Sequence, residues 1–63
     1  MTTKTKRIRN EFDVLWDIVL VQSDNESELQ NEMARLVNEG AQFNQRPVMR
    51  PDRRWFVVGD IPR

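Results

Sequence analysis

The segment Leu15–Val21 reads L-W-D-I-V-L-V, and its residue pattern decides what kind of fold this chain can adopt. Apolar residues stand at both odd and even positions, so an extended strand here offers apolar side chains to both faces of a sheet. A second such run, Trp55–Val58, reads W-F-V-V. We therefore expect two core strands with apolar residues on both faces, in a chain of 63 residues that suffices for one domain.

Between these two runs, the segment Asn25–Asn38 has the pattern of a helix. Its apolar residues recur at i, i+4, i+7 and i+8 from Leu29 to Val37, which makes a narrow apolar stripe. The polar segment Ser23–Glu26 is typical of a capped helix start, and Gly40 fits the left-handed position after a helix end. The chain therefore predicts one helix between its two apolar strands.

The remaining segments complete a small sheet. Val14–Gln22 is the first expected strand, and Ala41–Met49 is a weaker second one, placed at an edge because Pro47 cannot donate a ladder hydrogen bond. A turn at Arg50–Arg53 leads into the last and most apolar strand, Arg54–Gly59. A crossover helix leaves the first two strands parallel, with the last strand between them. The predicted fold is α+β, of type β-α-β-β, with a three-stranded sheet in the order 1-3-2 and one helix packed on one face.

Charge is segregated along the chain, although the formal net charge is zero. Residues 1–10 carry four cations and no acid, residues 11–39 carry eight acids against one Arg, and residues 40–63 carry five Arg against two Asp. The first segment has no apolar periodicity. We expect residues 1–10 to form a flexible basic arm and residues 11–63 to form a single α+β domain.

One helix covers only one face of a sheet, so a second surface must cover the other. We expect the helix on the face that holds Trp16, Ile18 and Leu20, which leaves Asp17 on the other face and in need of solvent or an arginine partner. The alternative is a monomer whose arginine stems and N-terminal arm fold over that face. Self-association is the simpler cover, and it predicts a homodimer whose interface holds Val19, Val21 and one alternating pair of the last strand, either Phe56 and Val58 or Trp55 and Val57. The interface candidates that we take are Val19, Val21, Phe56 and Val58.

No catalytic or metal-binding motif stands out. The chain has no His and no Cys, which removes the commonest general base, the thiol nucleophile, the usual zinc ligands and disulfides. Phosphate-binding and dinucleotide-binding glycine patterns and a nucleophile elbow are also missing. We therefore expect no enzyme activity, metal or cofactor. With no apolar run of membrane-spanning length and no signal peptide, we expect a soluble, cytoplasmic protein without a membrane partner.

Two charged surfaces are candidates for binding. The acidic face of the helix, with Glu28, Glu32 and Glu39, is suited to docking on a larger protein, although a merely solvated face explains it as well. The second surface is a basic hairpin, where arginine forks suit phosphate and an aromatic ring suits a base, although these charges also protect a hairpin from aggregation. The hairpin set consists of Arg46, Arg50, Arg53, Arg54 and Trp55.

The chain resembles small bacterial and phage β-α-β-β domains of unknown function in three segments: Trp16–Val21, Glu28–Gly40 and Trp55–Val58. Those domains carry Trp after the glycine, where Ala41 stands in this chain. The resemblance covers residues 14–59 and implies the fold, with no active residues attached to it.

The sequence thus predicts a small, non-enzymatic binding or inhibitor-type protein, of the phage or accessory kind. It is expected to assemble as an oligomer and to act by occupying a surface of a larger protein partner. The alternative is binding of nucleic acid or a nucleotide through the basic hairpin.

Overall fold

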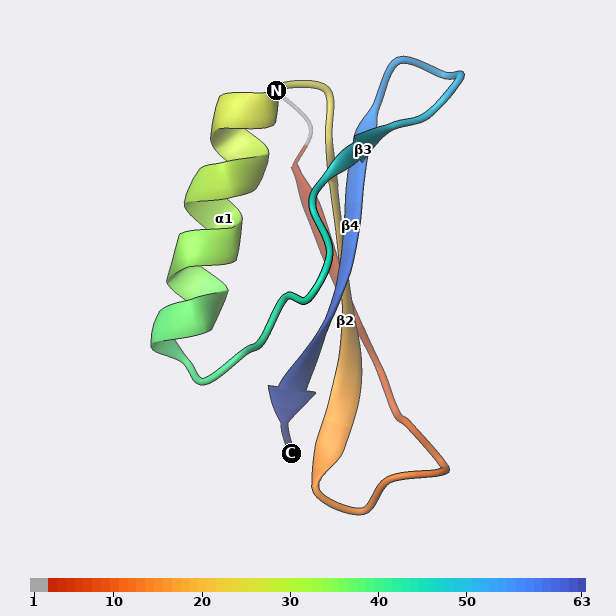
Figure 1. Cartoon of the computed structure of the whole chain (residues 1–63), viewed down its shortest axis with the longest axis vertical. Coiled ribbons are helices and arrows are strands. Elements are labelled where there is room, and N and C mark those ends of the chain that lie inside the picture. The colour runs from red at the N-terminus through yellow and green to blue at the C-terminus, as the bar shows by residue number, and fades with distance from the viewer. Residues whose placement is uncertain (1–2) are drawn as a thin grey trace.

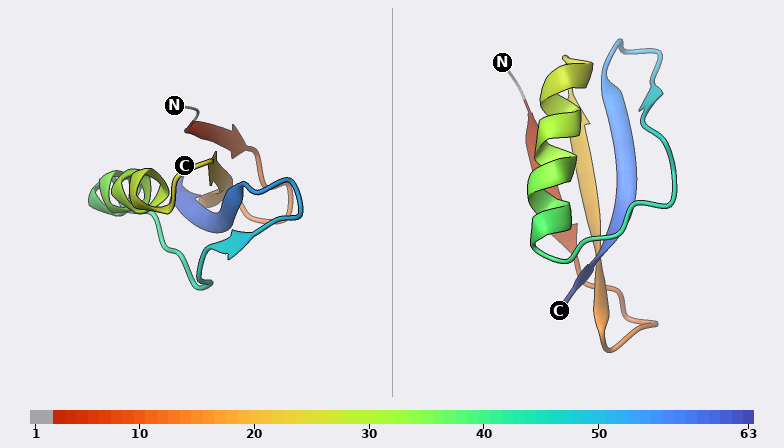
Figure 2. Two further views of the ribbon diagram at one scale, coloured as in Figure 1. Left: turned by 90° about the horizontal axis from the view of Figure 1, so that it is seen from above. Right: turned by 60° about the vertical axis from the view of Figure 1, so that its left-hand side comes forward.

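A computed structural model, which describes residues 3–63, places one helix against one face of a four-stranded antiparallel sheet (Figure 1). The strands lie in the order β1-β2-β4-β3, and each neighbouring pair is antiparallel. The view from above in Figure 2 shows the helix to one side of the strands. The elements are β1 (Lys4–Ile8), β2 (Trp16–Ser23), α1 (Glu26–Asn38), β3 (Val48–Met49) and β4 (Trp55–Pro62).

The α+β class and the order of the three expected strands agree with the prediction, since β4 lies between β2 and β3. The predicted number of strands is wrong. Part of the expected arm forms β1, which pairs with β2 from Lys4 opposite Gln22 to Ile8 opposite Ile18. All five residues of β1 are exposed, so no burial periodicity marks this strand in the sequence. Residues 1–2 of the expected arm lie outside the described residues.

Both ends of α1 have the expected capping chemistry. At the start, the Asn25 side chain accepts a hydrogen bond from the Glu28 backbone N–H at 3.2 Å. After the end, Gly40 has a φ of 101°, a left-handed conformation that glycine adopts without steric cost. The Ala41 N–H then donates to the Leu36 carbonyl at 3.0 Å, the longer bond of a Schellman motif. These local signals fix where the helix begins and ends.

The predicted position of the helix on the sheet is wrong. Val19 and Val21 of β2 are buried and form the core with Leu29 and Leu36 of α1. Successive residues of β2 alternate between buried and partly exposed, as a pleated strand requires. Since apolar residues stand on both faces of β2, hydrophobicity alone does not select the covered one. The face without the helix carries the three residues expected beneath it, Trp16, Ile18 and Leu20.

The connection from α1 to β3 lies across β4 instead of forming a full strand. Of the expected strand Ala41–Met49, only the last two residues form β3, while Gln42 makes an isolated bridge to Asp60 with N···O distances of 2.7 and 2.9 Å. A Cβ atom at Gly59 would stand 2.5 Å from the Phe43 ring, so glycine is needed for this close approach. The segment after α1 therefore covers one end of the core, where Phe43 packs against the buried residues.

We expect Leu29→Ala to lower the free energy of unfolding by about 2–5 kcal/mol, because it opens a cavity under the buried helix face. Val37→Ala, on the exposed side of the same helix, is the matched control and should cost less than about 1 kcal/mol. Urea denaturation of both variants measures the difference. Equal losses at the two positions would contradict the packing described above.

Candidate functional site

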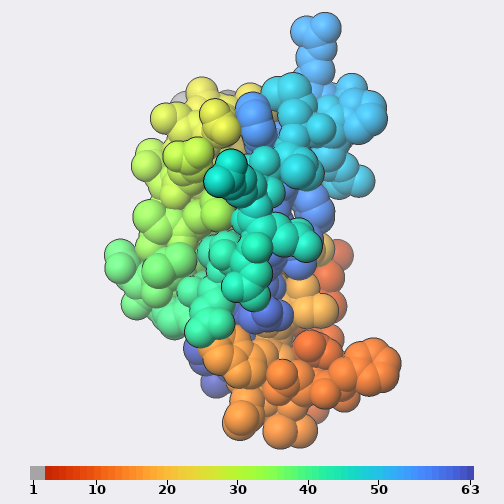
Figure 3. All heavy atoms as spheres, viewed as in Figure 1, coloured from red at the N-terminus to blue at the C-terminus, as the bar shows by residue number. Residues whose placement is uncertain are grey.

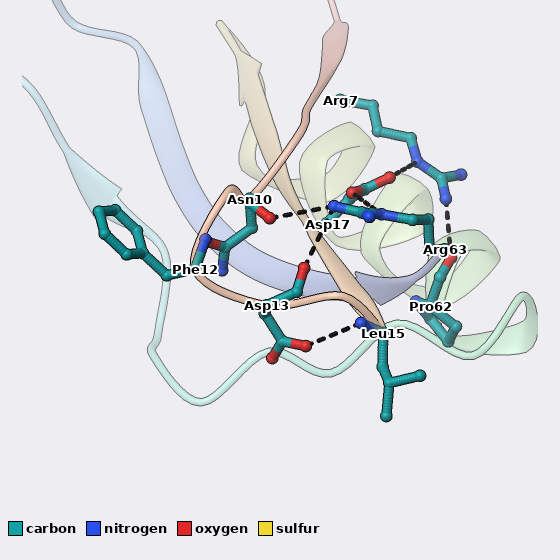
Figure 4. Close-up of polar contacts among 8 residues, drawn as sticks. All are labelled: Arg7, Asn10, Phe12, Asp13, Leu15, Asp17, Pro62 and Arg63. Carbon is teal, nitrogen blue, oxygen red and sulfur yellow. Dashed lines mark hydrogen bonds and ion pairs between the residues drawn. The ribbon is translucent and has the colours of Figure 1, made fainter.

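Asp17 is a carboxylate on the covered face of β2, and two arginines bind it. Its oxygens accept hydrogen bonds from Nε of Arg7 at 3.1 Å and from Nε of Arg63 at 3.0 Å (Figure 4). The hydrogen bond from Arg63 lowers the pKa of Asp17 most; burial opposes this, and Arg7 adds to the lowering. The arginine partner expected for Asp17 is therefore present.

Arg63 also holds the loop that joins β1 to β2. Its guanidinium donates to the carbonyl oxygens of Asn10 at 3.0 Å and Asp13 at 3.1 Å, while its backbone N–H donates to the Leu15 carbonyl at 2.9 Å (Figure 4). One side chain thus links Asp17 in the sheet to two backbone positions of the loop. Residues 9–15, which we call the braced loop, are tied to the end of the sheet by these bonds.

The braced loop is also fixed from within by two short polar side chains. Asn10 Oδ1 accepts the backbone N–H of Phe12 at 2.9 Å, and Asp13 Oδ1 accepts that of Leu15 at 2.8 Å. Asparagine and aspartate stabilise turns in this way, by bonding to the backbone two residues further on. Much of the polar backbone of the loop is therefore satisfied without help from its apolar side chains.

The apolar side chains of the braced loop point into solvent. Phe12 is fully exposed, and Val14 and Leu15 are 78% and 68% exposed. We call these three residues the apolar tip. In Figure 3 the loop, in orange, projects from the body of the molecule, and in Figure 4 Phe12 and Leu15 point away from the arginines. Single exposed apolar residues are ordinary on protein surfaces, but three within four positions form a patch typical of interaction sites.

The sequence does not reveal the apolar tip, because Val14 and Leu15 read as the first residues of the expected strand Val14–Gln22. Strand β2 begins only at Trp16. The available signal is the spacing of Asn10 and Asp13, each two residues before a residue of the tip, which is typical of consecutive turns. The bonds from Arg63 leave no such signal, because their donor lies about fifty residues away in the sequence.

A second candidate site is a groove on the sheet face opposite the helix, with a cavity volume of about 340 Å³. Paired residues of neighbouring strands share a face, so Lys6 of β1, Leu20 of β2 and Val58 of β4 stand in one row. The Arg50 guanidinium lies over the Phe56 ring, 4.8 Å from its centroid. We call this the sheet-face groove; the residues that line it are Lys4, Lys6, Leu20, Val21, Gln22, Arg50 and Phe56, and Val21 has its side chain buried on the other face.

The predicted basic hairpin set does not come together as one site. Only Arg50 of that set lines the sheet-face groove. Trp55 packs against the core on the helix side of β4, so its ring is not the stacking surface expected for it. Arg46, Arg53 and Arg54 are exposed around the turn. Phe56, the neighbour of Trp55, supplies the aromatic ring in the groove instead.

The predicted acidic helix face is partly occupied by its own contacts. Arg35 bonds to Glu32 at 2.7 and 2.8 Å and also pairs with Glu39, while Thr5 of β1 donates to Glu32. These bonds, chiefly those from Arg35, lower the pKa of Glu32 to about 2. Glu28 accepts a longer bond, at 3.4 Å, from Thr3. The face therefore presents a compensated network, and its role in docking stays a prediction.

The predicted oligomer patch is divided between the two faces of the sheet. Val19 and Val21 are buried under α1, so their placement on an uncovered surface is wrong. Phe56 and Val58 do lie on the uncovered face, because they pair with Gln22 and Leu20 there. A dimer interface built from all four residues is excluded by this arrangement.

The chain matches no protein-family model, no curated protein and no solved structure. The resemblance to small β-α-β-β domains therefore stays a prediction. No helix within residues 3–63 is long and apolar enough to cross a membrane.

We expect Arg63→Gln and Arg7→Gln to separate the two tasks of the arginines. Both substitutions should raise the pKa of Asp17, because each removes a hydrogen bond to its carboxylate. Only Arg63→Gln should loosen the braced loop, taking the backbone order parameter of Phe12 from about 0.85 towards 0.6 or below. NMR relaxation and carboxylate titration measure both effects. Equal loop order in the two variants would show that Arg63 is not the brace.

Proposed function

We propose that this protein is a non-enzymatic binding protein that inserts the apolar tip of its braced loop into an apolar pocket of a larger protein. The observation that carries the proposal is the complete exposure of Phe12 on a loop whose backbone is held by Arg63. A large aromatic side chain in water lacks the favourable free energy of burial, and folding within residues 3–63 does not provide it. Insertion of Phe12 into a partner's apolar pocket would provide this free energy.

The energetics of such an insertion are favourable. Full burial of a Phe, Val or Leu side chain contributes about 1.5–3 kcal/mol each, part of which is already realised for Leu15 and Val14. A loop fixed before binding loses little conformational freedom on binding, and this lowers one of the costs of association. Aromatic anchors at the centre of an interface, surrounded by polar groups, are typical of the residues that dominate binding energy.

Charged residues beside the apolar tip supply the polar rim. Arg9 and Glu11 are exposed and carry opposite signs. This balance favours a protein pocket with a mixed rim over an anionic lipid surface, which would select cations alone. Occupying a pocket blocks it for other ligands, so an inhibitor-type role of the phage or accessory kind, acting in the cytoplasm, is the form of this function that we propose.

Self-association stays a prediction, and the sheet edges argue against one route to it. Pairing of β1 with a second β1 would bring the cations of two edge strands together, namely Lys4, Lys6 and Arg7. The other edge, β3, has only two residues and stands between Pro47 and Pro51. A homodimer formed by pairing of two β1 edges or two β3 edges is therefore disfavoured.

Photo-cross-linking tests the proposed function. With p-benzoylphenylalanine in place of Phe12, we expect one discrete protein adduct in an extract of the source cells. The same probe at Gln30, an exposed helix position, is the matched control and should not give that adduct. Leu15→Asp in the probe-bearing chain should abolish it. With the partner isolated, Phe12→Ala should cost about 2 kcal/mol or more, roughly a 30-fold loss of affinity.

Three results would contradict the proposal. The first is the same set of adducts from positions 12 and 30, which would indicate nonspecific contact. The second is an adduct that survives Leu15→Asp, which would mean that the apolar tip does not determine binding. The third is an adduct between two copies of this chain, which would assign the tip to a homodimer instead of a larger partner.

A further inference from the structure

The sheet-face groove gathers positive charge around an apolar floor. Lys4 and Lys6 reach it from β1, Arg50 reaches it from the turn after β3, and Leu20 and Phe56 form the floor. No Asp or Glu is among the residues that line the groove. Among residues 3–63, the ion pairs join other residues, so these three cations are not neutralised by a neighbouring carboxylate.

The acidic residues lie mostly on the other side of the sheet. Helix α1 covers that side and carries Glu26 and Glu28 in its first turn, with Glu32 further along. Asp60 shares the uncovered face, but it pairs with Ile18 and lies beyond the row of Leu20. The net charge of zero therefore conceals a separation into an acidic helix side and a basic groove. A groove of this charge attracts an anionic ligand.

A second copy of this chain is a poor occupant for the groove. Two copies placed groove to groove would bring Lys4, Lys6 and Arg50 against their own counterparts, and like charges at an interface cost free energy. A ligand that carries regularly spaced negative charges and flat apolar groups satisfies both the cations and the floor. Nucleic acid has both features in every nucleotide.

We propose that the sheet-face groove binds single-stranded nucleic acid, with a base stacked on Phe56 and backbone phosphates on Lys4 and Lys6. The Arg50 guanidinium already lies over the Phe56 ring, 4.8 Å from its centroid, in a cation–π contact. A base takes that position, and the displaced guanidinium is then free to bind a phosphate. Lys4 and Lys6, two residues apart on one strand, stand roughly 7 Å apart, close to the separation of neighbouring phosphates in an extended strand.

The geometry favours a single strand over a duplex. Stacking on Phe56 requires a base whose flat face is free, whereas the bases of a duplex stack on one another. The floor of the groove is formed by Leu20 and Phe56, whose side chains lie on a sheet surface. Recognition is therefore expected to depend on stacking and charge and to show little base specificity.

Fluorescence anisotropy with labelled oligothymidylate tests this proposal over a range of salt concentrations. Lys4→Gln with Lys6→Gln should reduce the slope of log affinity against log salt by about 1.4, because each phosphate contact on a single strand contributes about 0.7. Phe56→Ala should weaken binding roughly 5- to 150-fold, the effect of losing one base–aromatic stack. Circular dichroism checks the fold of each variant, and the lysine pair decides the test if Phe56→Ala does not fold.

The matched control is Arg46→Gln with Arg54→Gln, which removes two exposed cations outside the groove. This pair should change the slope little, and Phe12→Ala should leave oligonucleotide affinity unchanged, so the result is independent of the proposed protein partner. The proposal is overturned if the wild-type chain does not bind oligothymidylate at low salt, if a duplex binds equally well, or if the Arg46 and Arg54 pair carries the salt dependence instead of the lysines.

Discussion

The rest of this structure depends on which face of β2 packs under the single helix described within residues 3–63. Successive side chains of a strand point to opposite faces, so one choice assigns every residue of β2 at once. Val19 and Val21 lie under α1 with Leu29, and the other half of the strand stays on the uncovered face. The same choice places Asp17 on the covered face and Leu20 in the sheet-face groove. Both candidate sites follow from it.

Because Asp17 lies on the covered face, its carboxylate needs cationic partners, and these partners determine the contacts at this end of the sheet. A carboxylate removed from water is stable only with a cation or several donors beside it. Arg7 and Arg63 meet this need, and Arg63 has donors to spare for the backbone of the braced loop. Arg63 therefore has two roles. It compensates the buried charge of Asp17, and it holds the backbone of the loop that carries Phe12.

Local chemistry is what the sequence predicts well here. The helix limits follow from Asn25 and Gly40, and the place of β4 between β2 and β3 follows from its apolar content. The sequence does not indicate which face of β2 is buried, because both faces carry apolar residues. Asp17 also makes the buried face the less hydrophobic of the two. The sequence also cannot reveal β1, whose residues are all exposed, or the distant bonds from Arg63. Each failure concerns contacts between segments that are far apart in the chain.

Methyl NOEs in a labelled sample test the face assignment most directly. We predict cross-peaks from the methyl groups of Leu29 and Leu36 to those of Val19, Val21 and Val57, because these residues share one core cluster. We also predict no cross-peaks from Leu29 to Ile18 or Leu20, because those residues lie on the opposite face of the sheet. Cross-peaks from Leu29 to Ile18 and Leu20, with none to Val19 and Val21, would contradict the account and remove the basis for both candidate sites.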